Sequence, residues 1–563
     1  MPRLALLHGY QRSWLRGDLT GGVTVAAYLV PQVMAYATVA GVSPVAGLWA
    51  ALPALVIYAL LGSSPSLSMG PEATTALMTA VAIGPLAAGD SARYAELAAT
   101  LALLVGVMGI AAWILRLGFV ADLLSRPVLI GYMAGVALIM IAGQLGRVTG
   151  VHVTGEEFIS QLRSFARGVT AAQPAVLAVA AAVLVFLVLL RWQWPTLPGP
   201  LLAVLLATAA VTAFSLARHG VAVVGPIPAG FPAPHVPALH ASELRVLLLP
   251  AFSVLIVGFS DDVLTARSFA RHGEVINANR ELLALGVGNA GAGLVRGFPV
   301  SSSATRTAIA VTSGSRSQVY SLATAVTVIV VLLVGRPVLA RFPTAALGAI
   351  VIYAAVQLID ITAFRRLFRF RRAELGIALA SGAAVLVFNI LYGVLVAIGL
   401  SVADLLVRVA RPHDAVLGLV PGLAGMHDVD DYPQAQTIPG LVVYRYDAPL
   451  CFANAEDFRR RALAAADQQG AALRWFVLNV EANVEVDFTA LEAMDAIRDE
   501  ITRRGAVFAL ARVKQDLLAR LQAFGLTDRV GASQLYPTLP TAVDAYRQWA
   551  HDHPAAEDPP AKA

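Results

Sequence analysis

Long apolar runs, broken by Gly, Pro and charged residues, follow one another from about Gly17 to Ala410. Runs of this length and composition predict membrane-spanning helices. We predict fourteen segments, seven on each side of a polar, proline-rich connection that ends at Glu243. The stretch 147–173 reads as a polar loop. The predicted segments are Leu19–Ala40, Pro44–Leu61, Gly70–Ala87, Tyr94–Leu115, Pro127–Gln144, Pro174–Leu190, Gly199–Leu216, Arg245–Phe269, Ala278–Leu294, Ser301–Ser313, Val319–Val334, Pro343–Ile359, Glu374–Phe388 and Tyr392–Arg408.

The third segment of each series is short and follows a Gly/Pro-containing stretch, 63–71 in the first series and 297–300 in the second. Matching interrupted segments of this kind indicate an inverted-repeat transporter. Because each repeat has an odd number of segments, the second repeat would insert upside down. We therefore expect two half-helices to meet near the middle of the membrane, with both N-termini directed at one site.

Composition supports a polytopic α-helical membrane protein. Of 563 residues, 58% are hydrophobic and 14% are charged, whereas soluble domains contain about 25% charged residues. The mean hydropathy is +0.70. Cys451 is the single cysteine, which excludes an internal disulfide and a cysteine-based metal site, and no metal or cofactor is expected. The 41 Lys and Arg residues exceed the 36 Asp and Glu residues only slightly, so no nucleic-acid partner is expected.

Arginine is concentrated in the turns on one side of the predicted membrane. The positive-inside rule makes that side cytoplasmic, together with both termini. We therefore predict a multi-pass protein of the inner (plasma) membrane. The turns on this side contain Arg116, Arg126, Arg191, Arg267, Arg271, Arg280, Arg365, Arg366, Arg369, Arg371, Arg372, Arg408 and Arg411, whereas Arg93, Arg147, Arg163, Arg167 and Arg336 fall on the other side.

The tenth predicted segment begins with hydroxyl side chains, including Ser302 and Ser303, and contains Thr305 and Arg306 one turn further on. A capped helix N-terminus offers free N–H groups and a positive dipole end to an anion. The sequence alone also allows an ordinary capped helix start. Arg306 is a candidate counter-charge for the anion, although it could instead pair with a carboxylate or extend to the interface.

Acidic residues within the apolar region are candidates for ion coupling. Glu72 lies at the start of the first half-helix, where a carboxylate suits the helix dipole but opposes a bound anion. Protonation of Glu72 would remove this conflict, although a purely structural helix charge is the alternative. Asp261 and Thr265 share one helix face and could form a proton or cation site, or cap neighbouring backbone. We expect Glu72 and Arg306 to face each other across the anion site.

The stretch Pro31-Gln32-Val33-Met34-Ala35-Tyr36-Ala37, followed by 40–49, resembles the signature of the SulP family, the sulfate permeases and solute carrier family 26 proteins. The stretches 279–282, 288–289, 298–299 and 305–307 fit the second half of that family. The resemblance implies a seven-plus-seven inverted repeat with core and gate domains. It also implies a substrate site between the third and tenth segments, and usually a homodimer.

By resemblance, Gln32 and Tyr36 match the first-segment site residues of the family, and Ser303, Ala304, Thr305 and Arg306 match the tenth-segment positions around the substrate. Asp261 and Thr265 match a sodium site of bicarbonate-transporting relatives. Ala304 replaces a threonine that binds sodium in those relatives, and Glu72 adds an acid that they lack. Both departures favour proton coupling over sodium coupling.

The tail alternates predicted strands and helices, namely Leu441–Tyr446, Asn454–Ala466, Trp475–Val480, Thr489–Arg503 and Val507–Ala511. This pattern, with Val486-Asp487-Phe488-Thr489-Ala490-Leu491, resembles a cytoplasmic α/β STAS domain. Thr489 matches a serine that is phosphorylated in bacterial relatives, although an N-cap is its simpler role. The predicted divisions are 1–411 for the transporter domain, 412–435 for a linker, 436–550 for the STAS domain and 551–563 for a disordered tail.

Three functions are consistent with the sequence, and none of them is enzymatic. The first, which we favour, is a secondary active transporter that imports sulfate with protons by elevator-like access. The second is a sodium-coupled bicarbonate or dicarboxylate transporter, or an uncoupled anion exchanger or channel. The third is a membrane-tethered signalling module that works through the tail. Backbone N–H groups and hydroxyls suit all of these anions, so the residues themselves do not select among them.

Overall fold

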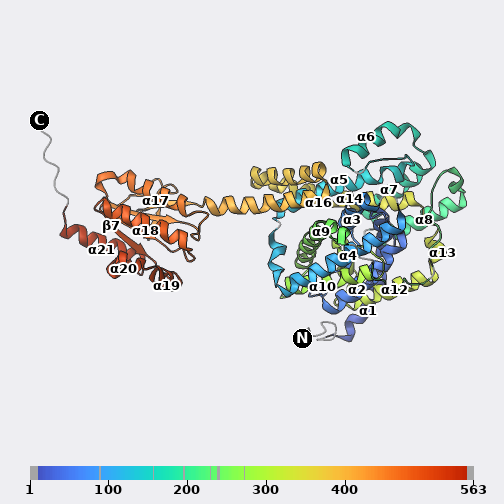
Figure 1. Ribbon diagram of the computed structural model, residues 1–563, viewed down its shortest axis with the longest axis horizontal. Helices are drawn as coiled ribbons and strands as arrows, with labels where there is room; N and C mark the ends of the chain where they lie inside the picture. The colour runs from blue at the N-terminus through green and yellow to red at the C-terminus, as the bar shows by residue number, and fades with distance from the viewer. Residues whose placement is uncertain are drawn as a thin grey trace. The chain divides into compact units, whose positions relative to one another are not determined.

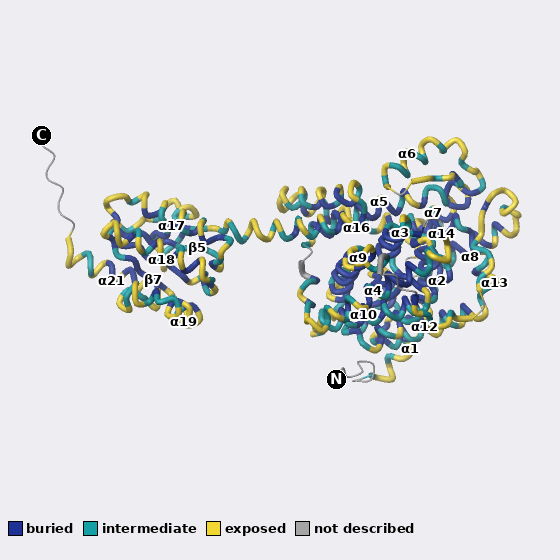
Figure 2. Tube along the Cα trace, in the orientation of Figure 1, coloured by how far each residue is buried: buried dark blue, intermediate teal, exposed yellow. Residues whose placement is uncertain are grey.

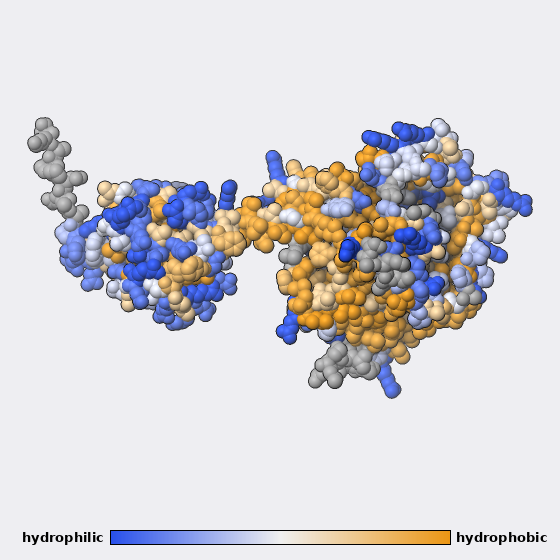
Figure 3. Space-filling view, in the orientation of Figure 1, coloured by the Kyte–Doolittle hydropathy of each residue, from blue (hydrophilic) through white to orange (hydrophobic). Residues whose placement is uncertain are grey.

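The computed structural model describes residues 10–87, 90–123, 125–155, 157–194, 197–228, 230–237, 241–271 and 273–554. The chain divides into two compact units, Met1–Ser401 and Val402–Ala563 (Figure 1). Apolar side chains dominate the outer surface of the first unit, whereas polar side chains dominate that of the second (Figure 3). This contrast is expected for a membrane unit and a water-soluble unit.

Each of the fourteen predicted segments corresponds to a helix. In the described chain, eight helices are long and apolar enough to cross a membrane, and the apolar helices Ala73–Ala87, Gly199–Ala213 and Val319–Val334 are shorter. The segment helices are α1 (Leu15–Val39), α2 (Pro44–Leu61), α3 (Ala73–Ala87), α4 (Ser91–Ile114), α5 (Arg126–Thr149), α7 (Pro174–Gln193), α8 (Gly199–Ala213), α9 (Ala241–Ser268), α10 (Ala278–Leu294), α11 (Ala304–Thr312), α12 (Val319–Val334), α14 (Thr344–Leu358) and α16 (Arg372–Ala410). The last two predicted segments are the halves of α16, which breaks at Asn389 (φ 75°, ψ 161°).

The structure differs from the prediction in two polar stretches. The loop predicted over 147–173 contains the end of α5 and the helix α6 (Phe158–Gly168). The arginine cluster that was predicted as a turn forms α15 (Ile361–Phe370), with Asp360 accepting a hydrogen bond from the backbone N–H of Ala363 at 2.8 Å. Both helices are short and amphipathic, so a search for long apolar runs misses them.

The membrane unit contains two groups of packed helices. We call α1–α4 and α9–α12 the core group, and α5, α7, α8 and α14 the gate group. Within the core group, α4 and α10 approach closely because glycines face each other. A Cβ atom added to Gly106 would lie 2.6 Å from the backbone N of Ala290, and one added to Gly109 would lie 2.9 Å from Cα of Gly286. Small residues therefore let these two backbones pack. Figure 2 shows buried residues, in dark blue, in the interior of both units.

The second unit contains a six-stranded sheet of order β4-β3-β5-β6-β7-β8. Strands β5 to β8 are parallel, and β3 is antiparallel to both of its neighbours. Helices α17, α18 and α19 pack on one face and α21 packs on the other. The elements are β3 (Asp414–Leu419), β4 (Met426–Asp428), β5 (Leu441–Tyr446), α17 (Ala455–Gln469), β6 (Trp475–Asn479), α18 (Phe488–Arg503), β7 (Val507–Ala511), α19 (Gln515–Phe524), α20 (Leu526–Val530), β8 (Leu535–Tyr536) and α21 (Leu539–Asp552).

Three details of the second unit differ from the sequence-based expectations. The predicted linker 412–435 contains β3 and β4, because Ala415 and Leu417 are buried beside β5. Asp487 caps α18 in place of Thr489, which is exposed, and accepts a hydrogen bond from the N–H of Ala490 at 2.8 Å. Of the predicted tail 551–563, residues 551 and 552 belong to α21, and 555–563 lie outside the described residues.

Candidate anion-binding cavity

Two short strands join the half-helices of the membrane unit. Strand β1 (Met69–Gly70) pairs antiparallel with β2 (Ser301–Ser302), with Met69 opposite Ser302 and Gly70 opposite Ser301. Helix α3 begins three residues after β1, and α11 begins two residues after β2. The structure thus brings the starts of the two half-helices together, as the repeat pattern predicts.

Buried polar side chains hold this strand pair in place. The amide of Asn289 on α10 accepts from the N–H of Val300 and donates to its carbonyl, both at 2.9 Å. Asp262 accepts from the N–H of Ser302 at 2.6 Å. On the other strand, the hydroxyl of Thr307 accepts from the N–H of Ser68 at 3.0 Å. These bonds satisfy backbone groups that the interrupted helices leave unpaired in an apolar environment.

The segment before β1 is held by α12 and α10. Gln318 donates to the carbonyls of Ser64 and Leu67 at 2.8 and 3.0 Å. Glu281, which is fully buried, accepts from the hydroxyl of Tyr58 and from the N–H and hydroxyl of Ser63 at 2.6–2.9 Å. Sequence reasoning did not assign these positioning roles to Asn289, Gln318 and Glu281. The signal for Asn289 and Glu281 is a polar side chain within the apolar helix α10, whereas Gln318 lies just before α12 and has no such signal.

A cavity of about 400 Å³ lies at the strand pair, and we call it the central cavity. Helices of both groups form its wall, since α1, α3, α9 and α11 belong to the core group and α5 and α14 to the gate group. It has the usual size of a small-ligand site. The predicted site residues that line it are Gln32, Tyr36, Glu72, Asp261, Thr265, Ser302, Ser303, Ala304 and Thr305.

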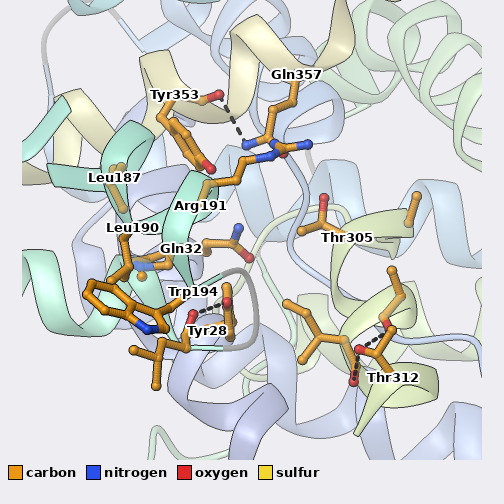
Figure 4. Close-up of a pocket in the computed structure, with 16 residues that line it drawn as sticks. Tyr28, Gln32, Leu187, Leu190, Arg191, Trp194, Thr305, Thr312, Tyr353 and Gln357 are labelled. Atoms are coloured by element: carbon orange, nitrogen blue, oxygen red, sulfur yellow. Dashed lines mark hydrogen bonds between the residues drawn. The ribbon is translucent and has the colours of Figure 1, made fainter. Parts of the chain in front are cut away.

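A second cavity, of about 450 Å³, adjoins the central cavity, and we call it the lateral cavity. The two share Gln32, Ala304, Thr305 and Gln357 as lining residues. Figure 4 shows Gln32 and Thr305 on separate elements, with the guanidinium of Arg191 hydrogen-bonded to Gln357 beside them. Gln32 and Thr305 therefore lie where the central and lateral cavities meet, between the core and gate groups.

Arg306 lies behind the strand pair and does not line the central cavity. Its side chain is fully buried and donates to the carbonyl of Pro71 at 3.0 Å and to the hydroxyl of Ser68 at 3.4 Å. Gly70 is small for this reason, because a Cβ atom there would approach Nη2 of Arg306 to 3.3 Å. The arginine therefore connects α11 to the residues before α3. The strand pair separates it from the central cavity, so its charge could act on an anion there only at a distance and not by the predicted direct contact.

Glu72 and Arg306 do not oppose each other across the cavity as expected. The carboxylate of Glu72 accepts from the N–H of Thr74 at 2.6 Å and so occupies the N-terminus of α3. Arg306 instead contacts the carbonyl of Pro71, the residue before Glu72. No ion pair between the two is present among the described residues. Glu72 already fills the helix end where an anion would bind, because a carboxylate suits free N–H groups and the dipole.

The N-terminus of α11 is open by comparison. Ser303 caps it by accepting from the N–H of Arg306 at 3.4 Å, whereas Ala304 and Thr305, the first two helical residues, are exposed and line the cavity. The hydroxyl oxygen of Ser302 is buried and has no hydrogen-bond partner among the described residues. These groups can donate hydrogen bonds to an anion.

The charged residues that line the central cavity are all acidic in the described chain: Glu72, Asp261 and Asp360. Asp261 and Thr265 line the cavity together, as their spacing on α9 predicts, while Asp262 points to β2. Asp360 caps α15. An anion entering this space meets two carboxylates, Glu72 and Asp261, that repel it unless a proton or a cation neutralises them.

Comparison with known proteins identifies the family. The model of the sulfate permease family matches residues 15–381, and that of the STAS domain matches residues 432–542. The chain belongs to the sulfate permease family. It is 58% identical to the probable sulfate transporter Rv1739c of Mycobacterium tuberculosis, over 97% of this chain and 98% of that protein. It is 27% identical to the low affinity sulfate transporter 3 of Stylosanthes hamata, over 97% of this chain and 89% of that protein.

Solved structures of this family have the same fold. Murine Slc26a9, an anion transporter in the inward-facing state, superimposes with a TM-score of 0.88 at 23% identity, over 96% of this chain and 93% of that chain. The transmembrane domain of the cyanobacterial bicarbonate transporter BicA gives 0.61 at 26% identity, over 70% of this chain and 98% of that domain. A sulfate permease domain followed by a STAS domain is therefore the architecture of the chain.

Proposed function

We propose that the protein is a secondary active transporter that imports sulfate together with protons. The observation that carries this proposal is the composition of the central cavity, which combines the open N-terminus of α11 with the carboxylates of Glu72 and Asp261. The first feature favours an anion, and the second disfavours one until the carboxylates are neutralised. Proton binding to either carboxylate would couple anion uptake to proton uptake. The names of the relatives, both of them sulfate transporters, support sulfate as the anion.

Movement of the core group against the gate group would give the cavity access to each side in turn. The cavity lies between the groups, and the site residues Gln32, Glu72, Asp261 and Thr305 all belong to the core group. A rigid core group could therefore carry its anion past the gate group without rebuilding the site. This geometry supports elevator-like alternating access.

The arginine distribution supports a plasma-membrane protein with both termini and the STAS domain in the cytoplasm. We also propose a homodimer, on the family resemblance. Light scattering of the detergent-solubilised protein would measure the mass directly, and a monomeric mass would contradict the dimer.

We further propose that Thr489, which is exposed at the start of α18, is a regulatory phosphorylation site.

Sealed vesicles containing the purified protein test the transport function. We expect inward flux of labelled sulfate that grows when an inward proton gradient is imposed, without sodium. Competition against chloride, bicarbonate and dicarboxylates would then rank the anions. If sulfate flux requires a sodium gradient, the coupling ion is sodium, bound at Asp261 and Thr265, and not the proton. Saturable bicarbonate or chloride flux without sulfate flux would contradict the proposed substrate.

A further inference from the structure

A third cavity, of about 260 Å³, is lined in part by α1, α3 and α5, which also line the central cavity. It lies nearer the other ends of these three helices, and we call it the Arg147 cavity. Helix α5 contributes Leu129, Ile130 and Met133 to the central cavity, and Ile139, Gln144 and Arg147, among others, to this one. Helices α1 and α3 likewise contribute to both. The two cavities share no lining residue.

A packed apolar layer separates the two cavities. Between Met133 and Ile139, α5 advances about 9 Å at the usual rise of an α-helix. Over this interval α5 contributes Val136 and Ala137, and α3 contributes Ala76 and Met78, all of them at most 1% exposed. Thus an anion cannot pass from one cavity to the other in this conformation.

Arg147 supplies a positive charge to the cavity. Its guanidinium donates to the hydroxyl and carbonyl of Thr38 at 3.1 and 2.7 Å, and to Oε1 of Gln144 at 3.1 Å. These bonds use both N–H groups of Nη1 and one of Nη2, so Nε and the second N–H of Nη2 remain for a ligand. In the described lining of this cavity there is no Asp or Glu, and Glu157 lines a smaller neighbouring space.

Three side-chain amides also line this cavity, those of Gln144, Gln161 and Asn389. Their N–H groups could donate to an anion, whereas Oε1 of Gln161, which is buried without a partner among the described residues, can only accept a hydrogen bond. The wall beside it is open, since the closest atom to a Cβ added at Gly143 is this same oxygen, at 3.9 Å. The cavity thus combines a guanidinium that has spare donors with amide N–H groups, and its described lining contains no carboxylate. Such a site is suited to a small oxyanion.

We propose that the Arg147 cavity is a second anion-binding site. A small oxyanion binds there before the apolar layer separates and lets it pass into the central cavity. The proposal rests on the proposed transport function. Arg147 lies on the gate group and its partner Thr38 on the core group, so the Arg147–Thr38 bonds also cross the surface where the groups would slide. An anion that takes the free donors of Arg147 therefore sits where the path must open.

Sulfate transport in oriented membrane vesicles tests this site, because the apolar layer separates it from the central cavity, so that an anion coming from one side would meet it first. In Arg147→Gln we expect the KM for sulfate to rise about tenfold from the side of the Arg147 cavity, the usual effect of losing one charge-assisted contact. From the opposite side the KM should stay within about twofold. Arg163→Gln removes an exposed arginine of α6 that does not line the cavity, and it should change neither value.

Two results would overturn the second site. One is an unchanged KM from both sides in Arg147→Gln, and the other is an equal rise from both sides, which would show that the mutation disturbs α1 and the central cavity. Arg147→Lys retains the charge and should keep the one-sided KM within about threefold. If the Lys variant shows the full rise, Arg147 acts through Thr38 alone and binds no anion.

The same experiment separates the two proposals. If the wild-type protein moves another anion and no sulfate, the proposed substrate is wrong, and the one-sided comparison with that anion still decides the role of Arg147. If sulfate transport is intact and the Gln variant behaves as wild type, the second site is wrong and the proposed function stands. Thermal melting of both Arg147 variants confirms that each has folded.

Discussion

At the scale of single residues, Glu72 and Asp261 place negative charge in the central cavity. Both carboxylates line a space whose best donors, on α11, suit an anion. Glu72 also caps α3 through the N–H of Thr74, so its charge occupies a position that an anion would otherwise take. Neutralising Glu72 would weaken that cap and, at the same time, reduce the repulsion between its carboxylate and a bound anion. Binding of a proton and of an anion should therefore favour each other.

Replacing Glu72 by Gln tests this coupling. The amide keeps the size of the side chain but carries no charge at any pH, so uptake should lose most of its dependence on pH. We expect Glu72→Gln to transport sulfate at high external pH at a rate that the wild type reaches only at low pH. Glu96→Gln, which changes a half-exposed carboxylate of α4 that contacts His235, is the control and should keep the wild-type profile. A wild-type profile in Glu72→Gln would remove Glu72 from the coupling.

Arg306 holds the backbone before α3, and we expect it to affect the anion through that backbone. Arg306→Lys keeps the charge but cannot reach both Pro71 and Ser68 with the same geometry. We expect the apparent affinity for sulfate to fall about tenfold, because each charge-assisted bond contributes roughly 1.5–3 kcal/mol. Arg306→Ala should weaken binding further and also lower the melting temperature, since the Pro71 carbonyl loses its partner. Sulfate binding at wild-type affinity in Arg306→Ala would show that this arginine has no part in recognition.

Element packing around the half-helices depends on residues that belong to neighbouring helices. The amide of Asn289 on α10 satisfies both backbone groups of Val300, and Gln318, the residue before α12, satisfies two carbonyls of the segment before β1. The half-helices are thus held from outside, because a strand pair of four residues cannot be stable alone. Loosening either support should move the N-terminus of α11 before it unfolds the core group.

Asn289→Ala should uncouple the strand pair from α10. Two buried backbone groups of Val300 would lose their partners, at about 1–3 kcal/mol each. We expect a lower melting temperature and a sulfate affinity reduced by at least tenfold. Asn279→Ala, on the same helix, removes a single hydrogen bond to the carbonyl of Trp113 and should affect stability less. Equal effects of the two variants would contradict the special role of Asn289.

The contact between α4 and α10 should tolerate no larger side chain. In Gly106→Ala the new Cβ atom would meet the backbone of Ala290 at 2.6 Å, so the helices must separate. Overpacking of this kind costs about 1–3 kcal/mol, and thermal melting would measure it. Gly376→Ala on α16 is the matched control, because nothing lies within 4 Å of its Cβ position. It should be neutral or slightly stabilising, since Ala favours helices over Gly.

At the scale of the whole molecule, the chain consists of two units with separate cores. The first unit buries its polar groups around two broken helices, and the second folds as a sheet covered by helices on both faces. The sheet of the second unit begins with β3 at Asp414, before the predicted start of the STAS domain at residue 436. Strand β3 lies between β4 and β5, so the sheet is incomplete when the chain starts at residue 436.

Two fragments of the second unit test this boundary. Residues 412–554 should form a soluble domain with a cooperative thermal transition, because the fragment contains every strand of the sheet. Residues 436–554 lack β3, so one edge of β5 and the side chains that pack against Ala415 and Leu417 become exposed. We expect this shorter fragment to melt at a lower temperature and to aggregate. Equal stability of the two fragments would contradict an essential role for β3.

The sequence by itself determined the number and order of the membrane segments, the repeat and the α/β tail, because these depend on hydrophobic length and local periodicity. It also indicated nine of the residues that line the central cavity: polar residues in apolar segments, such as Glu72 and Asp261, and positions given by the family resemblance, such as Gln32. Only the tertiary structure decided where Arg306 points, which residues support the strand pair, and that Arg147 lines a third cavity. These features depend on contacts between residues far apart in the chain, such as Arg306 with Pro71 and Arg147 with Thr38. No local pattern specifies the direction of a long flexible side chain, because that direction is set by the partners that folding brings within reach.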